Sequence, residues 1–446
     1  GLSLFTNYFS VAELVMMGIG VPALLIWLVA MWRRAGQYEG KMHRIPMLII
    51  VVAAFFGYSV LTNVAVDKRI ISTYFGNIAF AYQDYGLPYC FSASLFNTGI
   101  SEPNDYNKDT IEKITDNREM TESTSDNGVR PNVLFVQLES FFDPTLVNYL
   151  KVSEDPIPNF HNLETNYSTG YLTVPVVGAG TANTEFEVLT GMSMQYFGTG
   201  EYPYKTILKQ TDCESIADDL SQIGYGTHVV HNNTATFYSR NNAFSMMGFD
   251  TFTSKECMNI SQYTPNGNWP TDDVLVQETV KAMNATENQS DFVYTITVEG
   301  HGDYPTEKVL ENPDILVSGA ADEASNNQWE YYVNMIHEVD DFIGDLITAV
   351  DRRGEDTIIV FFGDHLPTMG LTDADMKSGD IFKTKYITWN NMGLAKKDAD
   401  LTAYQLLAHI TDQAGIHEGT MFRYHQTQTA SETVSYTHLT LPTIRL

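Results

Sequence analysis

Two long apolar segments, followed later in the chain by a strand that ends on a carboxylate, constrain this sequence more than any other feature. Residues 14–32 and 45–66 are almost uninterrupted apolar runs, and a helix needs roughly 20 such residues to cross a bilayer. Further along, the apolar run Val133–Leu138 ends at Glu139. This order predicts two transmembrane helices and then a separate folded domain with an ionisable group at the end of a strand.

The flanks of the apolar segments predict the side of the membrane on which that domain lies. Trp27 and Trp32 stand near the end of the first segment and are followed by Arg33 and Arg34, which is typical of a membrane interface. The loop before the second segment is also basic, and basic loops stay on the cytoplasmic side. We therefore expect residues 70–446 outside the cell. A pair of buried core helices is the alternative interpretation of the two segments.

The chain divides into four predicted parts. Residues 1–69 hold the transmembrane helices, 70–130 form a juxtamembrane segment and a charged linker, 131–430 form the external domain, and 431–446 resemble a non-native tail that we exclude from fold prediction. The first residue is Gly1 rather than Met, so we expect further membrane spans before it.

The composition argues against nucleic-acid binding and against a disulfide-stabilised fold. The 446 residues carry a net charge of −29, from 55 acidic and 26 basic side chains. A nucleic-acid binder needs a basic surface, and the sequence offers none. Three cysteines, Cys90, Cys213 and Cys257, are too few for a disulfide framework, although the sequence leaves a bridge between Cys213 and Cys257 open.

From residue 132 onward, apolar β-type runs alternate with helical segments, which is typical of an α/β domain. Ionisable groups follow four of these runs: Val133–Leu138 is followed by Glu139, Thr227–Val230 by His231, Val293–Val298 by Glu299 and His301, and Thr357–Phe362 by Asp364 and His365. Ligands of open α/β sheets bind at the carboxyl ends of the strands. We therefore expect these groups to meet in one site.

A glycine turn before a helix supplies a hydroxyl to the same region. Thr181 follows Gly178-Ala-Gly180, and apolar residues at helical spacing come next. A helix N-terminus attracts anions and can bind phosphate. Capping is the commonest role of a threonine in this place, and Thr184 competes with Thr181 for it. The sequence thus allows Thr181 to be either a helix cap or a reactive residue.

A threonine hydroxyl is a poor nucleophile unless a base or a cation stabilises its alkoxide. Glu139, Asp364 and His365 offer two carboxylates and an imidazole that can hold a divalent cation. Such a cation lowers the pKa of a bound oxygen. Mostly oxygen ligands with one nitrogen suit Mn²⁺ or Mg²⁺, and Zn²⁺ is compatible with them. The sequence therefore predicts a metal-activated Thr181.

These motifs together resemble the lipoteichoic acid synthase family, which are membrane-anchored members of the alkaline phosphatase/sulfatase superfamily. The motifs lie in order within residues 45–425: Gln137-Leu-Glu139-Ser, Gly180-Thr181-Ala-Asn-Thr-Glu-Phe, His231-Asn-Asn233 with Phe237-Tyr-Ser-Arg240, His301-Gly, and Gly363-Asp-His365. The resemblance implies an α/β fold with a central, mostly parallel sheet flanked by helices and preceded by transmembrane helices.

The resemblance also implies a role for each matching residue. Glu139, Thr181, Asp364 and His365 would hold one Mn²⁺, with Thr181 as the catalytic nucleophile. Arg240 and His301 match the substrate-binding arginine and histidine of the family. Tyr238 stands where the family has an active-site tryptophan, and this departure leaves its contact with substrate open. His231 and Asn233 are candidates for residues that surround the site.

Taken singly, the substrate-binding candidates have plainer interpretations. Arg240 would form a surface salt bridge, His301 and His231 would be hydrogen-bonded core histidines, and Tyr238 would only pack. In the context of the other motifs, the guanidinium of Arg240 matches phosphate oxygens. His301 can donate to a phosphate or protonate a leaving alkoxide.

The resemblance predicts a phosphoglycerol transferase that moves glycerol phosphate from phosphatidylglycerol to a glycerophosphate polymer or a glycolipid, as in the lipoteichoic acid synthesis of Gram-positive cells. The enzyme would be a multi-pass protein of the cell membrane with its catalytic domain on the extracellular face. The alternatives are a phosphoethanolamine transferase, another phosphoglycerol transferase or a sulfatase-family hydrolase acting on a cell-envelope glycan, and an inactive extracellular binding module. A true sulfatase is disfavoured because no cysteine stands in a Cys-x-Pro-x-Arg motif.

Overall fold

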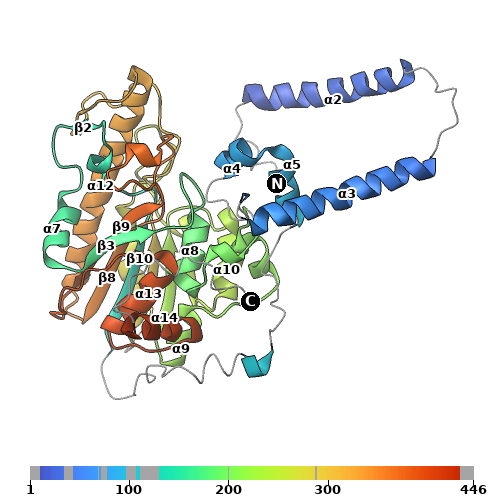
Figure 1. Ribbon diagram of the computed structural model, residues 1–446. Helices are drawn as coiled ribbons and strands as arrows, with labels where there is room; N and C mark the ends of the chain where they lie inside the picture. The colour runs from blue at the N-terminus through green and yellow to red at the C-terminus, as the bar shows by residue number, and fades with distance from the viewer. Residues whose placement is uncertain are drawn as a thin grey trace. The chain divides into compact units, whose positions relative to one another are not determined.

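The computed structural model describes residues 11–34, 44–68, 70–71, 78–96, 107–110, 130–198, 200–286 and 289–431. Contacts divide the chain into two compact units, residues 1–71 and 72–446 (Figure 1). Most of the predicted linker and all but one residue of the predicted tail lie outside the described residues.

The first unit contains two helices that coincide with the two apolar segments. Helix α2 spans Val11–Arg34 and helix α3 spans Arg44–Asp67. Among the described residues, one stretch, Arg44–Thr62 in α3, is long and apolar enough to cross a membrane, with a mean hydropathy of 2.2. The structure therefore supports a spanning helix for the second predicted segment. It shows the first segment as a helix, with Pro22 inside it.

A central sheet of eight strands forms the core of the second unit. In spatial order the strands are β10 (Leu401–Thr402), β3 (Thr169–Thr173), β9 (Lys383–Asn390), β8 (Thr357–Gly363), β1 (Asn132–Leu138), β6 (Asp291–Ile296), β4 (Gly226–His231) and β5 (Thr251–Ser254). Strand β9 pairs antiparallel with both neighbours, and the other pairs are parallel. A separate antiparallel pair is formed by β2 (Lys151–Val152) and β7 (Val317–Ser318).

Helices cover both faces of this sheet. The unit contains α4 (Ile78–Tyr85), α5 (Leu87–Phe96), α7 (Pro158–Asn166), α8 (Thr181–Thr190), α9 (Ile216–Gln222), α10 (Arg240–Met246), α11 (Val274–Met283), α12 (Glu323–Asp351), α13 (Ala403–Gln413) and α14 (Thr420–Ser431). Along β1, Val133 and Phe135 belong to one buried cluster together with side chains of α8, α9 and α13. Leu134 and Val136 belong to a second cluster with side chains of α7, α11 and α12. Burial on both faces explains why the central strands are mostly apolar rather than strictly alternating.

All four predicted strand-end motifs lie at or just after the carboxyl ends of strands of this sheet. The strands concerned, β8, β1, β6 and β4, are immediate neighbours and run parallel. Their carboxyl ends therefore meet at one edge, as the sequence predicted. The three cysteines are free thiols in the structure, so no bridge joins Cys213 to Cys257.

Candidate active site

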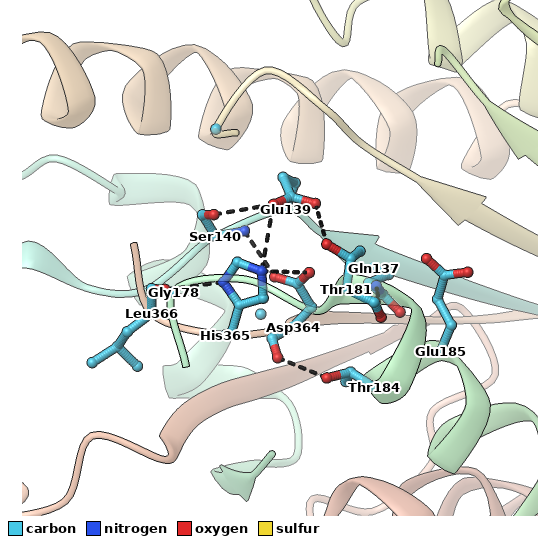
Figure 2. Close-up of polar contacts among 12 residues, drawn as sticks. Gln137, Glu139, Ser140, Gly178, Thr181, Thr184, Glu185, Asp364, His365 and Leu366 are labelled. Atoms are coloured by element: carbon cyan, nitrogen blue, oxygen red, sulfur yellow. Dashed lines mark hydrogen bonds and ion pairs between the residues drawn. The ribbon is translucent and has the colours of Figure 1, made fainter. Parts of the chain in front are cut away.

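The edge formed by the carboxyl ends of β8 and β1 brings together three ionisable side chains. Glu139 follows β1, and Asp364 and His365 follow β8 (Figure 2). One ligand atom from each residue lies within 4.8 Å of the other two, and all three side chains are buried. His365 Nε2 lies 3.6 Å from Glu139 Oε1 and 3.5 Å from Asp364 Oδ2. The structure thus places the three predicted ligands around one point.

Thr181 reaches the same point from the start of α8. The residue before it, Gly180, has a φ of 106°, and a Cβ at Gly180 would lie 2.9 Å from Val176 Cγ1. Only glycine adopts this left-handed turn without strain. The turn directs the Thr181 hydroxyl to Glu139, where Oγ1 donates to Oε2 over 2.9 Å. Thr181 is therefore the first residue of the helix, and its side chain bonds to the site rather than capping the helix.

The electronic state of these residues fits a divalent cation. His365 Nδ1 lies 2.9 Å from the carbonyl oxygen of Leu366. Because a carbonyl oxygen only accepts, Nδ1 donates to it, and Nε2 is left facing Glu139 and Asp364. His365 Nε2 and Asp364 Oδ2 are buried and have no hydrogen-bond partner among the described residues. Buried polar atoms are normally paired, so the two atoms indicate a ligand.

The charges of the two carboxylates support the same conclusion. Burial, and then the charge of Glu139, raise the pKa of Asp364 well above its ordinary value. Burial also acts to raise the pKa of Glu139, but His301, His365 and the hydrogen bond from Thr181 outweigh it and lower that pKa. Two carboxylates this close favour a bound cation that neutralises both.

Backbone and side-chain contacts fix the orientation of the ligands. Ser140 N donates to Asp364 Oδ1 over 2.8 Å, and Ser140 Oγ donates to Glu139 Oε1 over 3.1 Å. Thr184 Oγ1 donates to the carbonyl oxygen of Asp364 over 2.9 Å and so joins α8 to the end of β8. Thr184, which the sequence suggested as a cap, instead ties the helix of Thr181 to the strand of the ligands.

Arg240 lies at the start of α10 and is paired with an acidic residue that the sequence did not single out. Its Nε donates to both carboxylate oxygens of Glu185, over 3.2 and 3.1 Å, and its Nη2 also donates to Glu185 Oε1. Both side chains are buried, with Arg240 only 2% exposed. The plain interpretation of Arg240 as a surface salt bridge is wrong, because the pair is internal.

Tyr238 and His301, two of the predicted substrate-binding residues, each pack against another aromatic ring. Tyr238 is 8% exposed; its ring stacks on Tyr202 and lies 5.2 Å from the Arg240 guanidinium carbon. A second aromatic residue, Trp269, packs on the ring of His301 with the centroids 4.3 Å apart. No sequence signal pointed to Trp269, because this residue lies in a loop outside the strand-end motifs.

His231 and Asn233, the two candidates for surrounding residues, differ in their contacts. His231 Nδ1 lies 2.9 Å from the carbonyl oxygen of Ile296, and its Nε2 is buried without a described partner. Burial, and then the charge of Arg240, hold the pKa of His231 well below its ordinary value, so the ring is neutral. The side-chain oxygen of Asn233 accepts from Thr234 N over 2.7 Å, which is a local turn contact. A role of His231 and Asn233 around the site stays a prediction.

Comparison with known proteins agrees with this geometry. Residues 131–426 match the family model described as Sulfatase. A putative cyclic beta-1,2-glucan modification protein of Rhizobium meliloti is 29% identical over 350 residues, which are 75% of this chain and 53% of that protein. The chain thus spans about half the length of this curated relative.

Two solved structures share the fold. The phosphoglycerol transferase GacH of Streptococcus pyogenes, solved in complex with sn-glycerol-1-phosphate, superposes with a TM-score of 0.64 at 20% identity, covering 75% of this chain and 89% of that chain. The lipoteichoic acid synthase LtaP of Listeria monocytogenes gives a TM-score of 0.53 at 19% identity, covering 70% of this chain and 80% of that chain.

Proposed function

This chain belongs to the sulfatase family, and from that premise we propose that it is a metal-dependent phosphoglycerol transferase of the cell envelope. It takes glycerol phosphate from phosphatidylglycerol and passes it to a glycerophosphate polymer or a glycolipid. One observation carries the proposal: the Thr181 hydroxyl, at the start of a helix, bonds to Glu139 inside the cluster formed with Asp364 and His365. That arrangement is a nucleophile held beside a cation site.

In the first half of the reaction, Thr181 Oγ1 attacks the phosphorus of the phosphodiester. An Oγ1–P bond forms, the bond from phosphorus to the diacylglycerol oxygen breaks, and diacylglycerol leaves with a proton. Glu139 Oε2 already accepts the hydrogen bond of Thr181 and so orients the hydroxyl, which loses its proton to solvent as the Oγ1–P bond forms. A divalent cation bound by Glu139, Thr181, Asp364 and His365, with Mn²⁺ as our first expectation and Mg²⁺ or Zn²⁺ as alternatives, would stabilise the alkoxide and the phosphate charge.

The phosphate is held by neighbouring cationic and neutral donors. Arg240 Nη1 is buried without a partner among the described residues and can donate to a phosphate oxygen. His301 lies near enough to lower the pKa of Glu139 through its charge, and we assign it the proton for the leaving alkoxide. The second half reverses these roles: an acceptor hydroxyl attacks the phosphothreonine, and the Thr181 hydroxyl is regenerated.

The spanning stretch Arg44–Thr62 fits a lipid substrate. A membrane anchor holds the site close to phosphatidylglycerol and raises its effective concentration. We propose that the protein is a multi-pass membrane protein with this domain on the extracellular face, in agreement with the basic loop before the second apolar segment.

The alternative candidate functions differ in the acceptor or in the group that is transferred. The Rhizobium relative is described as a putative glucan modification protein, which favours transfer of glycerol phosphate to a hydroxyl of an envelope glycan. Transfer of phosphoethanolamine uses the same chemistry at phosphorus. An inactive binding module is separated from all of these by metal analysis of the purified protein: one divalent ion per chain supports an enzyme, and none supports the module.

The decisive experiment asks whether Thr181 becomes phosphorylated. Full-length protein is incubated with phosphatidylglycerol labelled in its headgroup and with Mn²⁺, and peptides are examined by mass spectrometry. We expect a glycerophosphate adduct on Thr181 and release of diacylglycerol, both absent from Thr181→Ala. The control is Thr190→Ala, at the other end of α8, where the hydroxyl donates to the carbonyl oxygen of Phe186 and accepts from Met192 N, both of them backbone groups. Unchanged turnover in Thr181→Ala would end the proposal.

A further inference from the structure

Glu185 is the acid that holds Arg240, and it lies on the same helix as Thr181. The two residues are four positions apart in α8, which places them one above the other on one face of the helix. Thr181 Oγ1 bonds to Glu139, and Glu185 bonds to Arg240. A single helical turn therefore links the nucleophile to the guanidinium.

The pair leaves one part of the guanidinium open. Glu185 engages Nε and Nη2 of Arg240, whereas Nη1 is buried and has no partner among the described residues. A guanidinium carries its donors in one rigid plane. Fixing one edge therefore fixes the direction in which Nη1 points.

The burial of the pair makes this restraint important. Arg240 is 2% exposed and Glu185 is 0% exposed, and a buried guanidinium without its own acid would be an uncompensated charge. With Glu185 in place, the pair is neutral as a whole, and Arg240 contributes a directed donor.

We propose that Glu185 is a positioning residue that holds Arg240 so that Nη1 donates to the substrate phosphate while Thr181 attacks it. The inference rests on the proposed function, because it assumes a phosphate at Thr181. The spacing Thr181-x-x-x-Glu185 then has a role in the reaction. The same helix positions the nucleophile directly and positions the phosphate donor, Arg240, through Glu185.

The test shortens the acid without removing its charge. Glu185→Asp retracts the carboxylate by one methylene group, so Arg240 shifts while the net charge stays the same. The matched control is Glu187→Asp, the same change at a buried acid of the same helix whose described backbone contact is with Met194. Rates of diacylglycerol release are expressed per folded protein, with folding checked by circular dichroism.

We expect Glu185→Asp to lower kcat by ~100-fold, the size of effect that follows a displacement of about 1 Å in an active site, and Glu187→Asp to keep near-normal kcat. In an Arg240→Met background, Glu185→Asp should cause no further loss, because Glu185 acts through Arg240. Equal losses in the two Asp variants, or the same additional loss with Met at position 240, would overturn the inference.

A second readout separates this inference from the proposed function. Binding of inorganic phosphate to the Mn²⁺-loaded full-length protein is measured by calorimetry. We expect Glu185→Asp to weaken phosphate binding at least tenfold and Glu187→Asp to leave it unchanged; equal affinities in all three proteins would refute the role of Glu185. If phosphate binding behaves as expected and no lipid is turned over, the proposed substrate is wrong and the role of Glu185 stands.

Discussion

Helix α8 carries a second buried acid, Glu187, whose protonation links the stability of the domain to pH. Its Oε1 accepts from Met194 N over 2.7 Å, and the side chain is 4% exposed. Burial raises the pKa of Glu187 to about 8. Between the ordinary pKa of a glutamate and this value, the carboxyl is neutral in the folded protein and charged in the unfolded chain.

Glu187→Gln should therefore make the free energy of unfolding less dependent on pH. The unfolded chain ionises first, so the contribution of Glu187 to stability is full below about pH 4.5 and is lost as pH rises towards 8. Each unit of pKa shift corresponds to about 1.4 kcal/mol, which makes the total loss several kcal/mol. Urea unfolding at about pH 5 and about pH 9 measures the difference. An equal decline with pH in the wild type and the variant would contradict the prediction.

At the scale of single residues, the sequence predicted which side chains meet better than it predicted the contacts around them. The convergence of Glu139, Thr181, Asp364 and His365 was predictable because each lies just after an apolar strand or a glycine turn. The pairing of Glu185 with Arg240 joins residues 55 positions apart, and sequence spacing does not encode such contacts. The one available signal was the spacing from Thr181 to Glu185, which puts both on one helix face.

At the scale of elements, the turn before α8 determines where Thr181 points. Gly180→Ala should both destabilise the domain and reduce lipid turnover. The change forces a side chain into a left-handed backbone at a φ of 106° and against Val176, at a cost of roughly 1–3 kcal/mol. Relief of that strain would rotate the turn and displace the Thr181 hydroxyl.

The control for this prediction is Gly354→Ala. Gly354 also has a positive φ, of 68°, but nothing lies within 4 Å of the added Cβ. Thermal unfolding and the rate of diacylglycerol release are measured for both variants. We expect a modest loss of stability in both proteins and a loss of turnover only in Gly180→Ala. Full turnover in Gly180→Ala would show that the turn does not position Thr181.

The elements that the sequence predicted are those with uniform burial. The four central strands are buried along their whole length, so they appear in the sequence as short apolar runs. Strand β9 was not predicted, because it begins Lys383-Thr-Lys385 and mixes polar and apolar residues. Its antiparallel direction depends on pairing with β3 and β8, which are distant in sequence.

At the scale of the whole molecule, the described residues of the candidate site all lie in the sulfatase match, residues 131–426, whereas the candidate spanning stretch is Arg44–Thr62. Because the two lie in separate parts of the chain, we predict that the domain can catalyse the reaction without the candidate spanning helix, which is needed only for access to lipid in a membrane. The fragment 130–431 should fold and turn over a short-chain, water-soluble phosphatidylglycerol. It should act poorly on phosphatidylglycerol in vesicles, because the anchor no longer raises the effective concentration of the lipid.

The charge of the chain gives a further reason to expect poor activity of the fragment on phosphatidylglycerol vesicles. The chain has a net charge of −29, and a phosphatidylglycerol surface is also anionic, so an unanchored acidic domain would be repelled by the proposed substrate. Salt screens such repulsion over distances of about 10 Å at 0.1 M. Added salt should therefore raise the rate of the fragment on vesicles while changing little for the full-length protein or for the soluble lipid. A fragment that matches the full-length protein on vesicles at low salt would show that the candidate spanning helix α3 has no part in substrate access.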